Sequence, residues 1–451
     1  MKKAFVKTIS LLLVLLCILP IFAGCSGKEK VEFDIQAENI SDDPLVICLG
    51  VNTLTTDGGA AYDDNANVKD FMYALEHTGG LTDVAFISIP PSGAEREARV
   101  DRLRVEIMSG GGPDVFIMSN NYGDEKEQKS NLFEYPQKSM EMGLFLPLDE
   151  YMENNTQFTE WDKLTQSVMA AGRNENGQQI IPVSYTLPLL CYPKEQVDYT
   201  PTREMCWDDM LNDPELAPIA HDLANCYGWE PDVDGLNGVT RYYMEYVLGE
   251  IYDFENETLS FTEDELLQRV NEILELGTED VNSNLSDKYS GAIEEWLGWG
   301  ISNNYFNKPL TLIPMYSDDG GVTANIEAYA AINRNTNHAD EAFTAIDVLM
   351  SRNVQQRNQM YTMYFANFAK FPMHEELFRE NTELANQYMT EENFNELCEV
   401  RDQITVANFG GRQREVLNEM LIHCRAAREN NESIEEIVHE AYADLERRVK
   451  E

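Results

Sequence analysis

Two tryptophans three positions apart, Trp296 and Trp299, stand in the glycine-rich stretch EEWLGWG and could provide the most specific chemistry in the chain. An indole ring is large and rigid, and its face can lie against the apolar C–H face of a sugar ring. The sugar hydroxyls then need polar partners, which short side chains of nearby loops can provide. Tryptophans can equally belong to a hydrophobic core. We expect at least one of these two rings to stack on a ligand.

Polar loops follow two segments that are predicted to be buried strands. Asp57 closes the loop NTLTTDGG after the predicted strand 45–51, and Asn121 and Tyr122 lie in SNNYG after the predicted strand 114–118. In an open α/β sheet, ligands bind beyond the carboxyl ends of the strands. We therefore expect Asp57, Asn121 and Tyr122 to contact a ligand. The alternative is that both loops are ordinary surface turns.

Strands and helices alternate around these loops. Apolar residues on both faces of segment 82–90 are typical of a strand that is covered on both sides. An amphipathic helix follows, with Leu103, Ile107 and Met108 in its apolar stripe. A later helix begins with a capping box, in which Thr262 precedes Glu265 by three positions. The alternation predicts an α/β fold with a mostly parallel sheet.

The first 24 residues have the composition of a bacterial export signal. Three lysines precede an apolar run that is short for a membrane-spanning helix, which needs about 20 residues. The run ends in FAGC, which resembles a lipobox whose cysteine, Cys25, carries the lipid. We expect a signal peptide over 1–24, a diacylglyceryl and palmitate anchor on Cys25, and a flexible tether over 25–43. An ordinary signal peptide or a membrane anchor is the alternative.

Composition excludes several classes of function. The formal net charge of −45 makes nucleic acid a poor partner. The six cysteines after Cys25 include no CxxC pair, and no histidine stands at zinc-ligand spacing to a cysteine. DVDGLNG at 232–238 lacks the remaining ligand spacing of a calcium loop. No GxSxG, HExxH or phosphate-binding loop is present. We expect no metal, no cofactor and no catalytic residues.

The order of several motifs is similar to that of bacterial extracellular solute-binding proteins of family 1, the sugar-binding receptors of ABC importers. RLRVEIMSGGGPDVFIM and GLFLPLDEYM come first, followed by NGQQIIPVSYTLPLLCYPKEQV. IPMYSDDGGVTANIEAYAAINRNTNHADEAFTAIDVLMS and two C-terminal helical segments complete the pattern. The resemblance spans most of the chain and is weakest over 195–310.

The resemblance implies a periplasmic-binding-protein-like fold of type II, in which two discontinuous α/β lobes are joined by crossing strands. It places the crossings near 182–188, 314–321 and 360–371, and the ligand in the cleft between the lobes. The predicted domains are lobe 1 over 44–184 and 320–362, and lobe 2 over 185–319 and 363–451.

The resemblance also implies ligand contacts from Tyr185 and Thr186 at the first crossing, and from Phe409 and Arg412 before a C-terminal helix. Core packing of Tyr185 and a purely structural helix start are the alternatives. The implied function is a monomeric, lipid-anchored receptor on the outer face of the cytoplasmic membrane that delivers a carbohydrate to the permease subunits of an ABC transporter. A receptor for a peptide or other solute, a sensor subunit, and a secreted glycoside hydrolase remain open alternatives.

Overall fold

A computed structural model of the chain gives the fold. The residues that it describes are 33–50, 65–90, 93–119, 131–187, 189–195, 199, 205–214, 216–217, 243–276, 309–360, 371–380, 390–409 and 412–450. A search of these residues finds no helix with the length and apolar character that a bilayer crossing requires.

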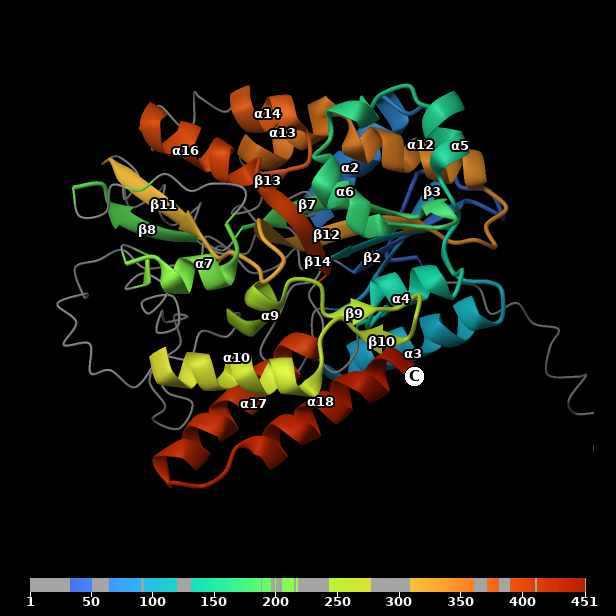
Figure 1. Cartoon of the computed structure of the whole chain (residues 1–451). Coiled ribbons are helices and arrows are strands. Elements are labelled where there is room, and N and C mark those ends of the chain that lie inside the picture. The colour runs from blue at the N-terminus through green and yellow to red at the C-terminus, as the bar shows by residue number, and fades with distance from the viewer. Residues whose placement is uncertain are drawn as a thin grey trace, which may run out of the picture.

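A mixed sheet of eight strands forms the centre of the molecule (Figure 1). Its order is β1-β3-β2-β4-β12-β7-β13, and β14 also pairs with β12. β2, β3 and β4 are mutually parallel as the sequence predicts, whereas β12 runs antiparallel to both β4 and β7. Parallel pairing therefore joins β2 to β3 and β4, and β12 to β14, whereas the other strand pairs of this sheet are antiparallel. The bounds are β1 Ile35–Gln36, β2 Leu45–Gly50, β3 Val84–Ser88, β4 Val115–Ser119, β7 Ile180–Thr186, β12 Val322–Ile332, β13 Phe371–Pro372 and β14 Ile404–Phe409.

Smaller strand pairs and helices surround this sheet. The pairs are β5 Arg173–Asn174 with β6 Gly177–Gln178, β8 Leu189–Pro193 with β11 Leu310–Pro314, and β9 Tyr252–Asp253 with β10 Thr258–Leu259. The helices are α2 Asn65–His77, α3 Gly93–Met108, α4 Pro136–Glu141, α5 Asp149–Asn154, α6 Gln166–Met169, α7 Trp207–Asn212, α9 Tyr243–Leu248, α10 Glu263–Leu276, α12 Ala339–Met350, α13 Arg352–Met360, α14 Glu375–Glu380, α16 Glu391–Arg401, α17 Arg412–Glu429 and α18 Glu435–Lys450.

Local sequence explains where several of these elements begin and which face they bury. The amide of Glu265 donates to the Thr262 hydroxyl at 3.3 Å, and the Thr262 amide donates to the Glu265 carboxylate at 2.7 Å, which confirms the predicted capping box of α10. In α3, Leu103 and Ile107 are buried as predicted, but Met108 is 83% exposed. Ile107 and Met108 are separated by about 100° around the helix, so they do not share the centre of a buried stripe.

β12 is a strand of 11 residues, every one of them buried, and it joins two parts of the sheet. Its N-terminal half pairs with β14, and its C-terminal half pairs with β4 on one side and β7 on the other. Gly321 leads into it with φ 79°, and a Cβ at this position would lie 2.9 Å from the Gln403 carbonyl oxygen. Only glycine fits this conformation and this close approach.

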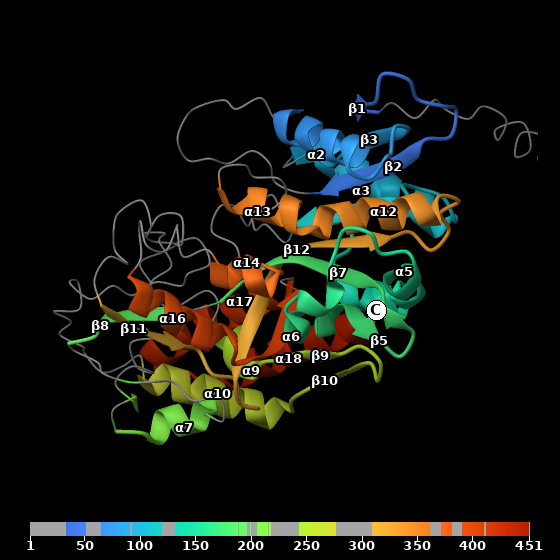
Figure 2. The same ribbon diagram turned by 90° about the horizontal axis from the view of Figure 1, so that it is seen from above.

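Two groups of elements lie on either side of β12 and β7 (Figure 2). One contains β2 and β3 with α2, α3 and α12, and the other contains β8 and β11 with α7, α10 and α16. The predicted first crossing, 182–188, falls on β7, and the predicted second crossing, 314–321, ends just before β12. Most of the third predicted crossing lies outside the described residues. The domain boundaries and crossings themselves remain predictions.

Cys48, Cys206, Cys398 and Cys424 are free thiols. Cys48, Cys398 and Cys424 are buried, as expected for thiols that pack as small apolar side chains. Burial raises the pKa of Cys48 to about 12 and that of Cys424 to about 11, so both thiols stay protonated at neutral pH.

Candidate functional site

Four of the predicted ligand-binding residues fall in the described part of the chain. Tyr185 and Thr186 end β7, Phe409 ends β14, and Arg412 begins α17. The others lie outside the described residues, and so does the predicted lipid attachment site. These are Asp57, Asn121, Tyr122, Trp296, Trp299 and Cys25.

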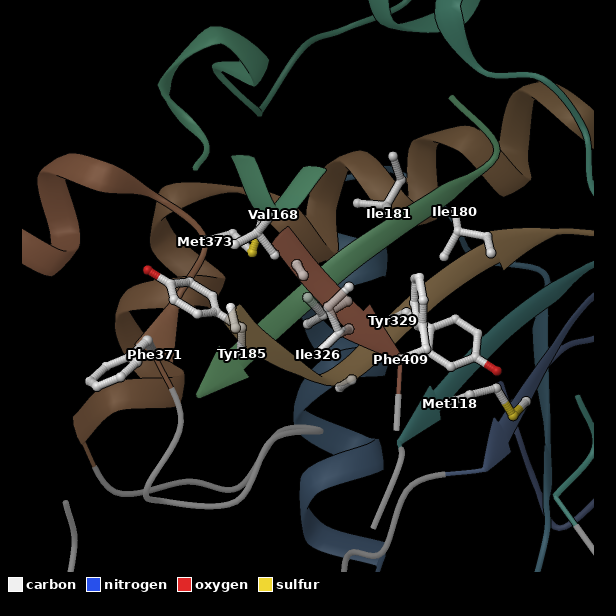
Figure 3. Close-up of a cluster of buried hydrophobic side chains, with 14 of the residues drawn as sticks. Met118, Val168, Ile180, Ile181, Tyr185, Ile326, Tyr329, Phe371, Met373 and Phe409 are labelled. Carbon is white, nitrogen blue, oxygen red and sulfur yellow. The ribbon is translucent and has the colours of Figure 1, made fainter. Parts of the chain in front are cut away.

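Tyr185 lies inside a cluster of apolar side chains (Figure 3). Its side chain is fully buried, and its ring centroid is 5.6 Å from that of Phe371, with which it is paired in register on β13. Burial raises the pKa of its phenol, whose oxygen has no hydrogen-bond partner in the described part of the chain. These surroundings resemble core packing, and a ligand contact by Tyr185 stays a prediction.

Phe409 lies at the other side of the same cluster, next to Tyr329 (Figure 3). The two rings meet edge to face with centroids 5.3 Å apart, and Phe409 is 4% exposed. Its carbonyl oxygen accepts a hydrogen bond from Gln413 Nε2 at 3.0 Å, which ties the end of β14 to the first turn of α17. Phe409 therefore has a structural role here, and its predicted ligand contact is an additional proposal.

A buried ion pair fixes the start of α17 against α9. Arg414 Nε donates to Glu245 Oε2 at 2.5 Å, and Gln413 Nε2 donates to Glu245 Oε1 at 3.2 Å. All three residues are at most 5% exposed. Because a charge buried without a partner is costly, this pair strongly constrains the orientation of the helix start that follows Phe409.

Thr186, Glu327 and Asn325 form a buried hydrogen-bonded group at the point where the pairing of β7 with β12 ends. The Thr186 hydroxyl donates to Glu327 Oε1 at 3.3 Å, and Asn325 Nδ2 donates to the same oxygen at 2.6 Å. Thr186, Asn325 and Glu327 are all at most 5% exposed. The Asn325 Oδ1 atom is buried and has no hydrogen-bond partner among the described residues. Such an acceptor costs about 1–3 kcal/mol unless a water or a ligand donates to it.

Asn325 and Glu327 were not identified by sequence reasoning, which treated this segment only as a strand. The signal was present, because Thr323, Asn325 and Glu327 place a polar side chain at every second position of an otherwise apolar segment. On a strand that is buried throughout, this pattern indicates a polar strip that needs partners. The Ser184 hydroxyl, two residues before Thr186, is also buried, and unlike that of Thr186 it has no hydrogen-bond partner among the described residues.

The arrangement is suited to holding hydroxyl groups by hydrogen bonds. Hydroxyl and amide side chains can each donate or accept, and a carboxylate accepts from up to two ligand hydroxyls. The described residues contain no group of three or more His, Cys, Asp or Glu side chains that could hold a metal ion. The weak calcium-loop sequence at 232–238 lies outside the described residues.

Comparison with solved structures identifies the fold. An extracellular solute-binding protein of family 1 from Alicyclobacillus acidocaldarius is similar over 92% of this chain and 100% of its own, with a TM-score of 0.57 at 13% identity. The sugar-binding protein MalE of Xanthomonas citri is similar over 90% of this chain and 97% of its own, with a TM-score of 0.54 at 12% identity.

A third solved structure is a cyclic α-maltosyl-1,6-maltose binding protein from Arthrobacter globiformis. It is similar over 91% of this chain and 100% of its own, with a TM-score of 0.51 at 12% identity. No family model matches the sequence, and no curated protein matches it. The chain therefore has the α/β fold of the extracellular solute-binding proteins, of the periplasmic-binding-protein-like type, as predicted from the sequence.

Proposed function

We propose that this protein is a carbohydrate receptor of an ABC importer, which binds a mono- or oligosaccharide between two lobes and delivers it to the membrane permease. The observation that carries the proposal is the likeness over at least nine-tenths of the chain to solute-binding proteins, among them two described as sugar-binding or as binding a cyclic maltosyl-maltose. The buried polar chain at Thr186 supports it, because hydroxyl and carboxylate groups of this kind bind sugar hydroxyls.

The proposed ligand site combines stacking and hydrogen bonding. Trp296 or Trp299 would stack on the sugar, and Asp57, Asn121 and Tyr122 would bind its hydroxyls. Tyr185, Thr186, Phe409 and Arg412 complete the proposed set. Binding to both lobes would favour the closed arrangement by the difference in contacts between the open and closed states.

The proposed anchor is a lipid on Cys25, which would hold the receptor at the outer face of the cytoplasmic membrane beside its permease. A diacylated cysteine gives firm attachment because two acyl chains bind a bilayer far more strongly than one. Cell fractionation of a Cys25→Ala variant tests this part, and release of the variant from the membrane is the expected result. Equal membrane retention of variant and wild type would contradict the proposed anchor.

A thermal-shift screen with maltose, maltotriose and cyclic α-maltosyl-1,6-maltose tests sugar binding. A sugar that binds should raise the melting temperature of the wild-type protein.

Titration of that sugar into the tryptophan variants tests the stacking. Loss of an anchoring tryptophan typically costs about 2 kcal/mol, so Trp296→Ala or Trp299→Ala should weaken binding roughly thirtyfold with little change in melting temperature. Trp207, which is 1% exposed, is the matched control. Trp207→Ala should lower stability by about 3–5 kcal/mol, as for a core aromatic. If both Trp296→Ala and Trp299→Ala keep the affinity of the wild type, the stacking proposal is wrong.

A further inference from the structure

Residues 34–37, which we call the β1 segment, belong to the predicted tether but are paired with the edge of the sheet. β1 runs antiparallel to β3. The Asp34 amide donates to the Phe86 carbonyl oxygen at 3.0 Å, and the Ala37 amide donates to that of Val84 at 3.0 Å. Without β1, β3 would be the edge strand on this side of the described sheet, and the pairing satisfies its backbone groups.

The side chain of Asp34 reinforces this pairing. Its Oδ2 atom accepts a hydrogen bond from the Ser88 amide at 2.7 Å, and Arg99 Nη1 of α3 lies 3.7 Å from the same oxygen. Farther along the chain, the Ser41 amide donates to Asp83 Oδ1 at 2.9 Å, just before β3 begins. A hydrogen bond from an amide to a carboxylate is charge-assisted and stronger than a neutral one. The chain is therefore bound to β3 or its flanking residues at two successive points.

The β1 segment sets how far the body of the protein can lie from the proposed lipid on Cys25. The nine peptide links from Cys25 to Asp34 span at most about 30 Å. Without the pairing, the twenty links from Cys25 to Leu45 would span at most about 70 Å. A compact chain of this length is roughly 55 Å across. The shorter reach excludes orientations in which the opposite side of the molecule faces the bilayer, whereas the longer reach allows any orientation.

We propose that the β1 segment orients the receptor on the membrane, because it keeps the face formed by β1, β3 and α3 toward the lipid surface that holds Cys25. This inference rests on the proposed lipid anchor. β1 and β3 lie on one side of the molecule, and α7 and α10 lie on the other (Figure 2). α7 and α10 therefore point away from the bilayer. The acyl chains supply the affinity for the membrane, and the β1 segment restricts the orientation.

Energy transfer from a fluorophore on the protein to labelled lipids tests this orientation. The full-length lipoprotein is reconstituted into phosphatidylcholine vesicles. The fluorophore is introduced through an unnatural amino acid at residue 97 of α3 or at residue 264 of α10, both of which are exposed. With a reach of about 30 Å, transfer from residue 97 should be at least about threefold that from residue 264. Equal transfer from the two positions would overturn the proposal.

A variant that breaks the pairing tests the cause of the orientation. Asp34→Ala combined with Ala37→Pro removes the bonds to Ser88 and Val84, since proline has no amide hydrogen. The reach then grows to about 70 Å, so transfer from residue 97 should fall at least about twofold and approach that from residue 264. Asp42→Ala removes the same charge from an exposed residue nearby and should leave transfer as in the wild type. Unchanged transfer in the double variant would show that β1 does not set the orientation.

Hydrogen exchange separates a failure of the pairing from a failure of the lipid anchor. The amides of residues 34–41 should exchange about tenfold more slowly in the vesicle-bound wild type than in the double variant. Equally fast exchange in both proteins would overturn the proposal and leave the anchor intact. Slow exchange in a protein that does not bind the vesicles would mean that the anchor is wrong, and the proposed orientation would be wrong with it.

Discussion

The two halves of β12 are equally buried but have opposite chemistry. Residues 328–332 are apolar, and they pair with β4 on one side and β7 on the other. Residues 322–326 pair with β14, and the half that ends at residue 327 includes the polar side chains Thr323, Asn325 and Glu327. The apolar half adds stability by removing side chains from water. The polar half contributes less and needs hydrogen-bond partners, so we infer that it is retained for binding.

This difference shows where to look for function in a strand whose burial is uniform. Burial alone does not separate the halves, since every residue of β12 is buried. The separation comes from the hydrogen-bonding groups, which begin where β7 diverges and Thr186 reaches Glu327. Substitutions in the apolar half should therefore change stability, and those in the polar half should change affinity.

The largest effect is expected from Ile332→Ala in the apolar half. Ile332 is fully buried and is paired in register with Val115 of β4. Removing a buried isoleucine side chain leaves a cavity and costs about 2–5 kcal/mol of unfolding free energy. Urea denaturation measures this loss, and sugar affinity should stay within twofold. A stable variant with weakened sugar binding would reverse the roles that we assign to the two halves.

Glu396 on α16, away from β12, shows how burial of a carboxyl group changes its pKa and the stability of the protein. The raised pKa of Glu396, about 7, means that the native state binds more protons than the unfolded state between about pH 4.5 and 7. The unfolding free energy should therefore fall as pH rises through this interval. Glu396→Gln removes the cost of burying an ionised carboxylate and should stabilise the protein by about 1–3 kcal/mol at pH 8.

The stability of Glu396→Gln and of the wild type is also compared at pH 5, as a control. Both proteins are then largely neutral at this position, so the difference in urea midpoint should shrink. A variant that is less stable than the wild type at pH 8 would contradict the raised pKa. Sugar affinity should be unchanged at both pH values, since α16 lies outside the proposed sugar site.

Glu327→Gln tests the polar half directly. The change keeps the size of the side chain but removes the charge that accepts from Asn325 and Thr186. Charged hydrogen bonds are stronger than neutral ones, so sugar affinity should fall about five- to tenfold. Asn333→Ala is the matched control, because its buried amide donates to the carbonyl oxygens of Gly111 and Pro113 away from Thr186. If Glu327→Gln and Asn333→Ala lose sugar affinity equally, the polar half of β12 has no particular role in binding.

The smallest effect is expected from Arg102→Ala on the exposed face of α3. Arg102 Nε lies 2.9 Å from Glu106 Oε1, and both side chains are more than one-third exposed. Surface pairs of this spacing contribute about 0.3–0.5 kcal/mol. The urea midpoint should barely move, and affinity should not change. If Arg102→Ala lost more than about 1 kcal/mol of unfolding free energy, surface ion pairs would contribute more to stability than we expect.

Much of the fold could be predicted because periodicity reports local structure directly. The strands that became β2, β3 and β4 are short apolar runs between turn signals, and the capping box at Thr262 has a fixed spacing. The exposure of Met108 was not predicted, because which residues at the margin of an apolar helix face are buried depends on the elements that pack against the helix. Glu327 was missed because its meaning depends on Thr186, which is 141 positions away in the sequence.

Calorimetric titration of maltotriose and cyclic α-maltosyl-1,6-maltose into the wild-type protein, with mass spectrometry of the sugar afterwards, tests the central claim most directly. We predict saturable binding of at least one of these sugars at one site per protein, with the sugar recovered unbroken. Cleavage of the bound sugar would contradict a receptor and favour a hydrolase. Absence of binding to any member of an extended sugar panel, together with saturable binding of a peptide, would contradict the carbohydrate assignment.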